Sequence, residues 1–173
     1  MPAGFKCRAF PAWCYFWSKF VGGVGELADG ALRRAAVVAL GELGRSSDFG
    51  DRADAGRGLA GFAEMEEAVS PLLELVLDRE DTFVTRVTAE ALLRRQDRAG
   101  LGIVASALAV ASPNHSDWIH TAILDVFALY ASDRDDAVRL CEMLTRDTDE
   151  RVALGARELH ESLSGISCVL YPA

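Results

Sequence analysis

The glycine-rich stretches of the chain come nearest to a nucleotide-binding motif. Residues 56–61, GRGLAG, match G-x-G-x-x-G, and residues 23–28, GVGELA, match its variant ending in alanine. A dinucleotide site needs this motif between a strand and a helix of a βαβ unit. No strand pattern precedes residue 56, and no series of parallel strands follows residue 28. We therefore interpret 56–61 as a glycine-weakened helix and expect no nucleotide cofactor at either stretch.

The chain is also poor in metal ligands and nucleophile motifs. Its three histidines are His115, His120 and His160, and only His115, Asp117 and His120 lie close enough in sequence to share a metal. Their spacing is not that of a recognised ligand set. No serine or cysteine stands in a nucleophile motif such as G-x-S-x-G. We predict no metal and no cofactor; we favour a non-catalytic chain and leave an enzyme open as the alternative.

Composition limits the partners. The net charge of -8 and the pI of about 4.9 disfavour nonspecific binding to nucleic acid or to an anionic membrane. No apolar run approaches the roughly 20 residues of a membrane span. The four cysteines have no CxxC spacing, so we expect reduced thiols and a cytoplasmic protein.

Four long segments have a helical period, with apolar residues at i, i+3, i+4 and i+7. They are 31–44, 81–97, 117–131 and 149–163. In each segment the helix is expected to start just after an aspartate that caps it. These aspartates are Asp29, Asp81, Asp117 and Asp149. Asp51 opens a further candidate helix, over 51–65.

Shorter apolar segments alternate with these helices. They cover 70–78, 99–111 and 135–146, and the first is expected to begin with Ser70 as the cap and Pro71 in the first turn. The segment 99–111 is apolar nearly all round, so it should be well buried. The acidic turns between helices, such as DRED, are interpreted as caps. The pattern predicts an all-α chain of about eight helices, in pairs that repeat every 30 to 36 residues.

The paired segments resemble a known family. An apolar helix such as PLLELVLD, an acidic turn such as DREDTF and a helix of the form V-x-R-x-x-A-x-A-L are similar to HEAT-like repeats, in particular to the alanine-rich bacterial, phycobilisome-lyase type. The resemblance covers about residues 29–163. It implies an all-α, right-handed α-solenoid of about four HEAT-like helix pairs, with the second helices lining a concave face. It also implies a binding scaffold, since few members are enzymes.

The resemblance places the expected binding surface on polar positions of the second helices. These are Arg86, Glu90, Arg94, His120, Asp125, Arg157 and Glu161. We expect a non-catalytic scaffold that binds a protein or peptide. The alternatives are a HEAT-like enzyme or cofactor-handling protein (bilin-lyase-like or metal-dependent) and a nucleic-acid-binding protein. Because Glu90 lies at i,i+4 spacing between Arg86 and Arg94, a salt-bridged helix face is also expected.

The ends of the chain differ from its body. We divide it into an aromatic-rich N-terminal segment, 1–25, a HEAT-like repeat domain, 26–165, and a C-terminal tail, 166–173. Seven of the fourteen aromatic residues lie in the first twenty. That segment could cap the first repeat, lie on a membrane, bind a partner or be poorly ordered. We favour a cap, because the exposed end of a helical stack must be covered.

Overall fold

The structure, a computed structural model, describes residues 29–171. Within this range the chain is helical, without a strand beyond one isolated bridge, and the all-α prediction is confirmed. A first helix covers 29–43. The seven that follow are α2 (Phe49–Ala60), α3 (Glu66–Val76), α4 (Thr82–Leu93), α5 (Arg98–Leu108), α6 (Pro113–Phe127), α7 (Ala131–Leu144) and α8 (Glu150–Ser164).

Two compact units share the chain, Met1–Ala36 and Val37–Ala173. Of the first unit, the described residues 29–36 form the opening turns of the helix that ends at residue 43. The second unit holds α2 to α8 and the buried core. The boundary expected between 25 and 26, and the aromatic N-terminal segment, lie outside the described residues.

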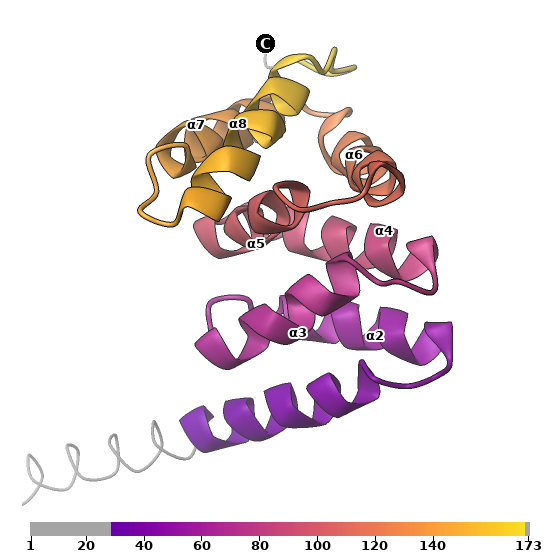
Figure 1. Cartoon of the computed structure of the whole chain (residues 1–173). Helices are drawn as coiled ribbons and strands as arrows, with labels where there is room; N and C mark the ends of the chain where they lie inside the picture. The colour runs from indigo at the N-terminus through magenta and orange to yellow at the C-terminus, as the bar shows by residue number, and fades with distance from the viewer. Residues whose placement is uncertain (1–28, 172–173) are drawn as a thin grey trace, which may run out of the picture. The chain divides into compact units, whose positions relative to one another are not determined.

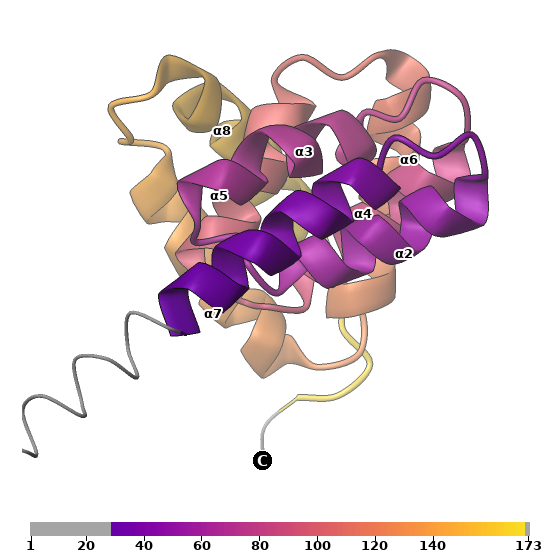
Figure 2. The same cartoon turned by 90° about the horizontal axis from the view of Figure 1, so that it is seen from below.

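The helices of the second unit form two rows. In one row α4 packs against both α2 and α6, and in the other α5 packs against α3 and α8 (Figure 1). Figure 2 keeps the same separation, with α2, α4 and α6 on one side and α3, α5 and α8 on the other. The core between the rows is apolar, and α5 is buried along most of its length, as its composition predicts.

The last helix pair departs from this alternation. A strictly alternating stack would place α8 beside α6, but α8 packs mainly against α5 and α7. The contact with α5 is close, because a Cβ built on Gly155 of α8 would lie 1.8 Å from the carbonyl oxygen of Ala105. Only glycine permits helix backbones to approach to this distance.

The glycines of the GRGLAG stretch serve the same kind of packing. A Cβ on Gly56 would lie 2.1 Å from Oγ1 of Thr88 on α4, and one on Gly58 would lie 2.9 Å from Leu40. The stretch lies in α2 and the turn that follows it, as the interpretation of a glycine-weakened helix requires. The spacing therefore reflects close contacts between helices.

Capping aspartates were predicted with mixed success. Asp81 and Asp149 cap α4 and α8 through their side chains, as expected. The predictions for Asp51 and Asp117 are wrong, because Asp48 caps α2 and Ser112 caps α6 one turn or more upstream. In both cases a better-placed acceptor with extended backbone precedes the predicted residue, which then lies inside the helix.

The predicted start of α3 is also wrong. Ser70 is not a cap, and Pro71 lies inside a helix that begins at Glu66. A proline here removes one backbone hydrogen bond, to the carbonyl four residues earlier. The buried stripe of Ala68, Leu72 and Leu75 extends through this position, and its burial offsets the lost hydrogen bond.

The segment expected as a C-terminal tail packs back on the α6–α7 loop. The Val169 and Leu170 amides donate to the carbonyls of Ala128 and Leu129, and Leu170 accepts from the amide of Ala131. Cys168 is buried, with Sγ 3.4 Å from the carbonyl oxygen of Phe127. The described end of the chain thus pairs with the start of α7 as a short parallel bridge (Figures 1 and 2).

The helices of residues 29–171 are short or carry charged residues. None combines the length and the apolar composition needed to cross a bilayer.

Two glycines predict opposite responses to the same substitution. A Cβ on Gly102 of α5 meets nothing within 4 Å, whereas one on Gly155 strikes the α5 backbone. We expect Gly102→Ala to raise the free energy of unfolding by about 0.5–1 kcal/mol through helix propensity. We expect Gly155→Ala to lower it by about 2–3 kcal/mol by forcing α8 away from α5. Urea unfolding measures both, and equal effects would contradict the α5–α8 contact.

A buried hydroxyl predicts a stabilising change. Oγ1 of Thr85 on α4 is fully buried and has no hydrogen-bond partner. An unsatisfied buried hydroxyl costs free energy, so Thr85→Val should raise the free energy of unfolding by about 1 kcal/mol. Thr121→Val is the control, because Oγ1 of Thr121 donates to the carbonyl of Asp117 on a half-exposed surface. A lower melting temperature for Thr85→Val than for the native chain would contradict the expectation.

Candidate functional site

The expected binding residues of α4 and α6 lie together. Nε and Nη2 of Arg86 donate to Oδ2 of Asp125 at 3.0 and 2.7 Å, across the contact between the two helices. Glu90 and Arg94 form an i,i+4 ion pair of 2.6 Å on α4. The expected salt-bridged face is present, except that Arg86 pairs with the neighbouring helix and not with Glu90.

Aromatic side chains continue this surface onto α2. Phe49 and Phe83 meet edge to face, with ring centroids 6.0 Å apart, and Cζ of Arg57 lies 5.9 Å from the centre of the Phe83 ring. Arg57 also pairs with Asp54 at 2.8 Å. Both phenylalanines are exposed, by 51% and 40%, which is unusual for a residue type that cores normally bury.

Trp118 completes the surface on α6. It is 36% exposed and lies seven residues before Asp125, two helical turns away on the same side. We call the whole surface the arginine–aromatic strip. Its members are Phe49, Asp54, Arg57, Phe83, Arg86, Glu90, Arg94, Trp118 and Asp125.

The remaining expected residues lie elsewhere. His120 turns toward α8, where Nε2 is 2.9 Å from Oγ of Ser162, and Nδ1 is 2.7 Å from the carbonyl oxygen of Ser116. Arg157 and Glu161 are exposed on α8. Because α8 packs beside α5, these two residues belong to the other row of helices. The structure therefore brings together four of the seven expected residues, on α4 and α6.

His115, like His120, has structural hydrogen bonds. Nε2 of His115 lies 2.8 Å from the carbonyl oxygen of Asp78, and its Nδ1 lies 2.8 Å from Oγ of Ser112. Among the described residues, no group of three or more His, Cys, Asp or Glu side chains is arranged to hold a metal ion. Of the cysteines in this range, Cys141 is fully buried, and burial raises its pKa to about 12. It is the small buried side chain that the sequence predicts.

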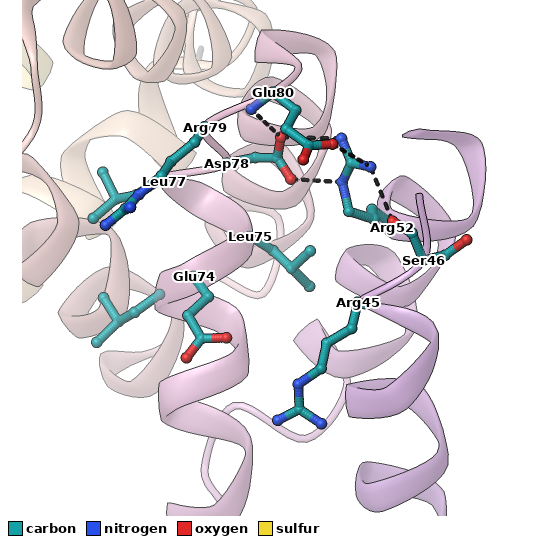
Figure 3. A pocket seen from close by; sticks show the side chains of 11 residues that line it. Arg45, Ser46, Arg52, Glu74, Leu75, Leu77, Asp78, Arg79 and Glu80 are labelled. Carbon is teal, nitrogen blue, oxygen red and sulfur yellow. Dashed lines mark hydrogen bonds and ion pairs between the residues drawn. The ribbon is translucent and has the colours of Figure 1, made fainter. Parts of the chain in front are cut away.

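A pocket lies where α3 ends, beside the start of α2. It measures about 570 Å³, and Figure 3 shows Arg52 at one end, with Arg45 and Glu74 away from it. Arg52 and Asp78 are only 5% and 8% exposed. The guanidinium donates from Nε to Oδ2 of Asp78 at 2.7 Å and from Nη2 to Oδ1 at 3.2 Å.

Each guanidinium nitrogen of Arg52 is already hydrogen-bonded within the chain. Nη1 donates to the carbonyls of Ser46 and Ser47 and lies 3.2 Å from Oε2 of Glu80 (Figure 3). Oδ1 of Asp78 also accepts from the amides of Glu80 and Asp81. This arrangement leaves no guanidinium fork to clamp an anion, so the pair stabilises the fold and is not a ligand site.

The electrostatics agree with a stabilising pair. Burial by itself raises the pKa of Asp78. The hydrogen bonds from Arg52 and from the Asp81 and Glu80 amides lower this pKa by more than burial raises it. The net pKa therefore lies below the ordinary value. Arg52 has a raised pKa, because its hydrogen bond to Asp78 outweighs the cost of burial.

The sequence analysis predicts neither Arg52 and Asp78 nor the strip residues Phe49, Asp54, Arg57, Phe83 and Trp118. A signal existed for Arg52, which lies on the same helical stripe as the buried Ala55, Gly56 and Leu59. A charge on an apolar stripe requires a buried partner. Asp78, in the DRED turn, was interpreted only as part of a cap. No signal in the sequence distinguished the exposed Phe49 and Phe83 from core residues.

Comparison with known proteins identifies no family. No family model matches the chain, and no curated protein matches it. Among solved structures it is similar to an engineered protein from the Northeast Structural Genomics Consortium. The identity is 22%, the match covers 80% of this chain and 67% of that chain, and the TM-score is 0.33. A likeness of this degree carries no argument about fold or function.

The buried ion pair predicts a large loss of stability in one variant. Asp78→Asn leaves the buried Arg52 charge with only the exposed Glu80 carboxylate as its counter-charge, so the free energy of unfolding should fall by about 3 kcal/mol. The matched control is Asp54→Asn, in the exposed pair with Arg57, which should cost less than about 1 kcal/mol. Urea unfolding at neutral pH compares the two, and similar losses would contradict the role of Asp78.

The Arg52–Asp78 pair also predicts that the free energy of unfolding falls at acidic pH. Because its pKa is lower in the folded chain, ionised Asp78 stabilises the fold fully above the unfolded-state pKa of about 3.9. This stabilisation is lost as pH falls through the folded-state pKa. The difference in unfolding free energy between the native chain and Asp78→Asn should therefore narrow from about pH 6 to about pH 3. A constant difference would show that Asp78 is not the titrating group.

Proposed function

We propose that this chain is a HEAT-like α-solenoid that binds another protein and catalyses no reaction. The proposal extends to a right-handed superhelix of about four helix pairs. The stacking of α2, α4 and α6 in one row and of α3 and α5 in the other supports it, because repeat proteins bury their apolar stripes between neighbouring units. The proposed compartment is the cytoplasm, where the buried thiols Cys141 and Cys168 would stay reduced.

The observation that carries the proposed function is the arginine–aromatic strip. Binding sites for proteins are enriched in Phe, Trp and Arg and gain most of their affinity from a few such residues. Phe49, Phe83 and Trp118 supply this apolar area across α2, α4 and α6. The partner would cover the rings and make its polar contacts with the ion pairs around them.

The ion pairs on the strip favour a protein over a nucleic acid as the binding partner. Arg57, Arg86 and Arg94 each pair with an acid of the strip, at 2.8, 2.7 and 2.6 Å. Phosphate binding depends on basic groups that are free to replace counterions. Here the three acids neutralise the three arginines, so the strip does not attract a polyanion.

The test is affinity capture of a partner by strip variants. The native chain, an Arg86→Ala/Glu90→Ala/Arg94→Ala variant and a Phe83→Ala/Trp118→Ala variant are compared in soluble lysate of the source organism. We expect one protein in stoichiometric amount with the native chain, and at least about a tenfold loss with the aromatic double variant. Melting temperatures should change little, because all five side chains are partly or fully exposed.

The control carries substitutions on another exposed surface. Arg139 and Glu142 lie on α7 and are exposed, so Arg139→Ala/Glu142→Ala should capture the same partner in full. If both strip variants retain the partner, the strip is not the binding surface. A sample with a visible absorption band or stoichiometric metal would instead favour a cofactor-handling protein.

A further inference from the structure

The exposed stripe of α4 forms the middle of the arginine–aromatic strip. Its four members follow the spacing i, i+3, i+7, i+11, which places them on one face of the helix. They are Phe83, Arg86, Glu90 and Arg94. Phe83 and Arg94, at the two ends of the stripe, are exposed, and the two residues between them are partly exposed. Because α4 packs between α2 and α6 in its row, this stripe is the part of the strip that a partner would cover first.

Two charged groups of the stripe have hydrogen-bonding capacity that the chain does not use. Nε and Nη2 of Arg86 donate to Asp125, but Nη1 makes no hydrogen bond with any described residue. Oε1 of Glu90 lies 2.6 Å from Nη2 of Arg94, and Oε2 makes no hydrogen bond within the part of the chain that the structure describes. The ion pairs within the chain can therefore stay in place while Arg86 donates, and Glu90 accepts, one further bond each.

An antiparallel second α4 would bring these unused groups together. In a two-fold symmetric dimer the same surface lies on both sides, so residue i meets residue j and j meets i. With the axis between Arg86 and Glu90, each Arg86 faces Glu90 of the second copy. The same register places Phe83 opposite Arg94 of the second copy, because these two residues lie about one turn further out on either side. An arginine over a phenylalanine ring adds a cation–π attraction.

The distribution of charge favours the strip over the acidic remainder of the chain for self-association. The three arginines and three acids of the strip sum to zero, so the full net charge of -8 belongs to the other residues. Contact between two copies through a net-negative surface juxtaposes like charges, which costs free energy. The strip lets two copies approach without this repulsion, and its exposed rings supply apolar area for the contact.

We propose that the arginine–aromatic strip binds the same strip of a second copy of this chain, in a two-fold symmetric dimer with antiparallel α4 helices. The inference rests on the proposed function, because it names the partner of the same surface. Reciprocal bonds between Arg86 and Glu90 set the register. Phe83 and Trp118 provide the apolar area that the dimer removes from water. The protein captured from lysate of the source organism would then be the chain itself.

Sedimentation velocity of the full chain over a range of concentrations tests the proposal. We expect a monomer–dimer equilibrium for the native chain. Arg86→Glu and Glu90→Arg each place like charges opposite one another at both reciprocal contacts, so either variant alone should raise the dimer Kd at least about tenfold. Arg139→Glu makes the same change of charge as Arg86→Glu on the exposed surface of α7. This control should leave the dimer Kd unchanged.

A mixture of the two strip variants gives the sharpest comparison. In a heterodimer of Arg86→Glu with Glu90→Arg, both reciprocal contacts again join opposite charges, one of them with its sign reversed. An equimolar mixture should therefore dimerise with a Kd close to that of the native chain, although neither variant does so alone. Circular dichroism and melting temperatures confirm that each variant is folded, and recovery in the mixture shows the same independently.

The outcomes separate this inference from the proposed function. A native dimer Kd weaker than about 1 mM overturns the inference, as does a dimer that both variants retain. Variants that lose the dimer without recovery in the mixture overturn it too, because the antiparallel register requires that recovery. A monomeric native chain that captures a different protein through Phe83 and Trp118 removes this inference and leaves the proposed function standing. Absence of both the dimer and a captured partner contradicts both.

Discussion

One buried ion pair connects most of the N-terminal half of the second unit. Arg52 of α2 binds the carboxylate of Asp78 in the α3–α4 turn and the carbonyls of the loop before α2. The carbonyl of Asp78 in turn is hydrogen-bonded to His115 of α6. Burying two charges is costly unless every lone pair and proton has a partner. Since each nitrogen of the guanidinium and both oxygens of the carboxylate are hydrogen-bonded, the pair fixes how α2, the α3–α4 turn and α6 meet.

Close helix contacts set the remaining geometry. Gly56 lets α2 approach Thr88 of α4, and Gly155 lets α8 approach Ala105 of α5. These two contacts permit the close packing of α2 on α4 and of α8 on α5. The arginine–aromatic strip depends on the first row, because its residues lie on α2, α4 and α6 and at their ends.

The sequence predicted the helices well because their apolar stripes are strong and regular. It placed Asp81 and Asp149 correctly as caps, since each directly precedes a periodic segment. It failed where tertiary contacts override local signals, as at Pro71, which stays inside α3 because the buried stripe continues on both sides of it. Within the strip, the Glu90–Arg94 pair followed from i,i+4 spacing, but the Arg86–Asp125 pair joins residues 39 positions apart. No local pattern predicts such a pairing.

The C-terminal bridge has a consequence for the order in which the molecule is assembled. The amide of Ala131, at the first residue of α7, finds its acceptor in Leu170, and Cys168 meets the carbonyl of Phe127, which lies 41 residues earlier. During synthesis these groups emerge well before their partners exist. The N-terminal end of α7 therefore reaches its final form only after α8 has left the ribosome, whereas the α2–α4 contacts can form earlier.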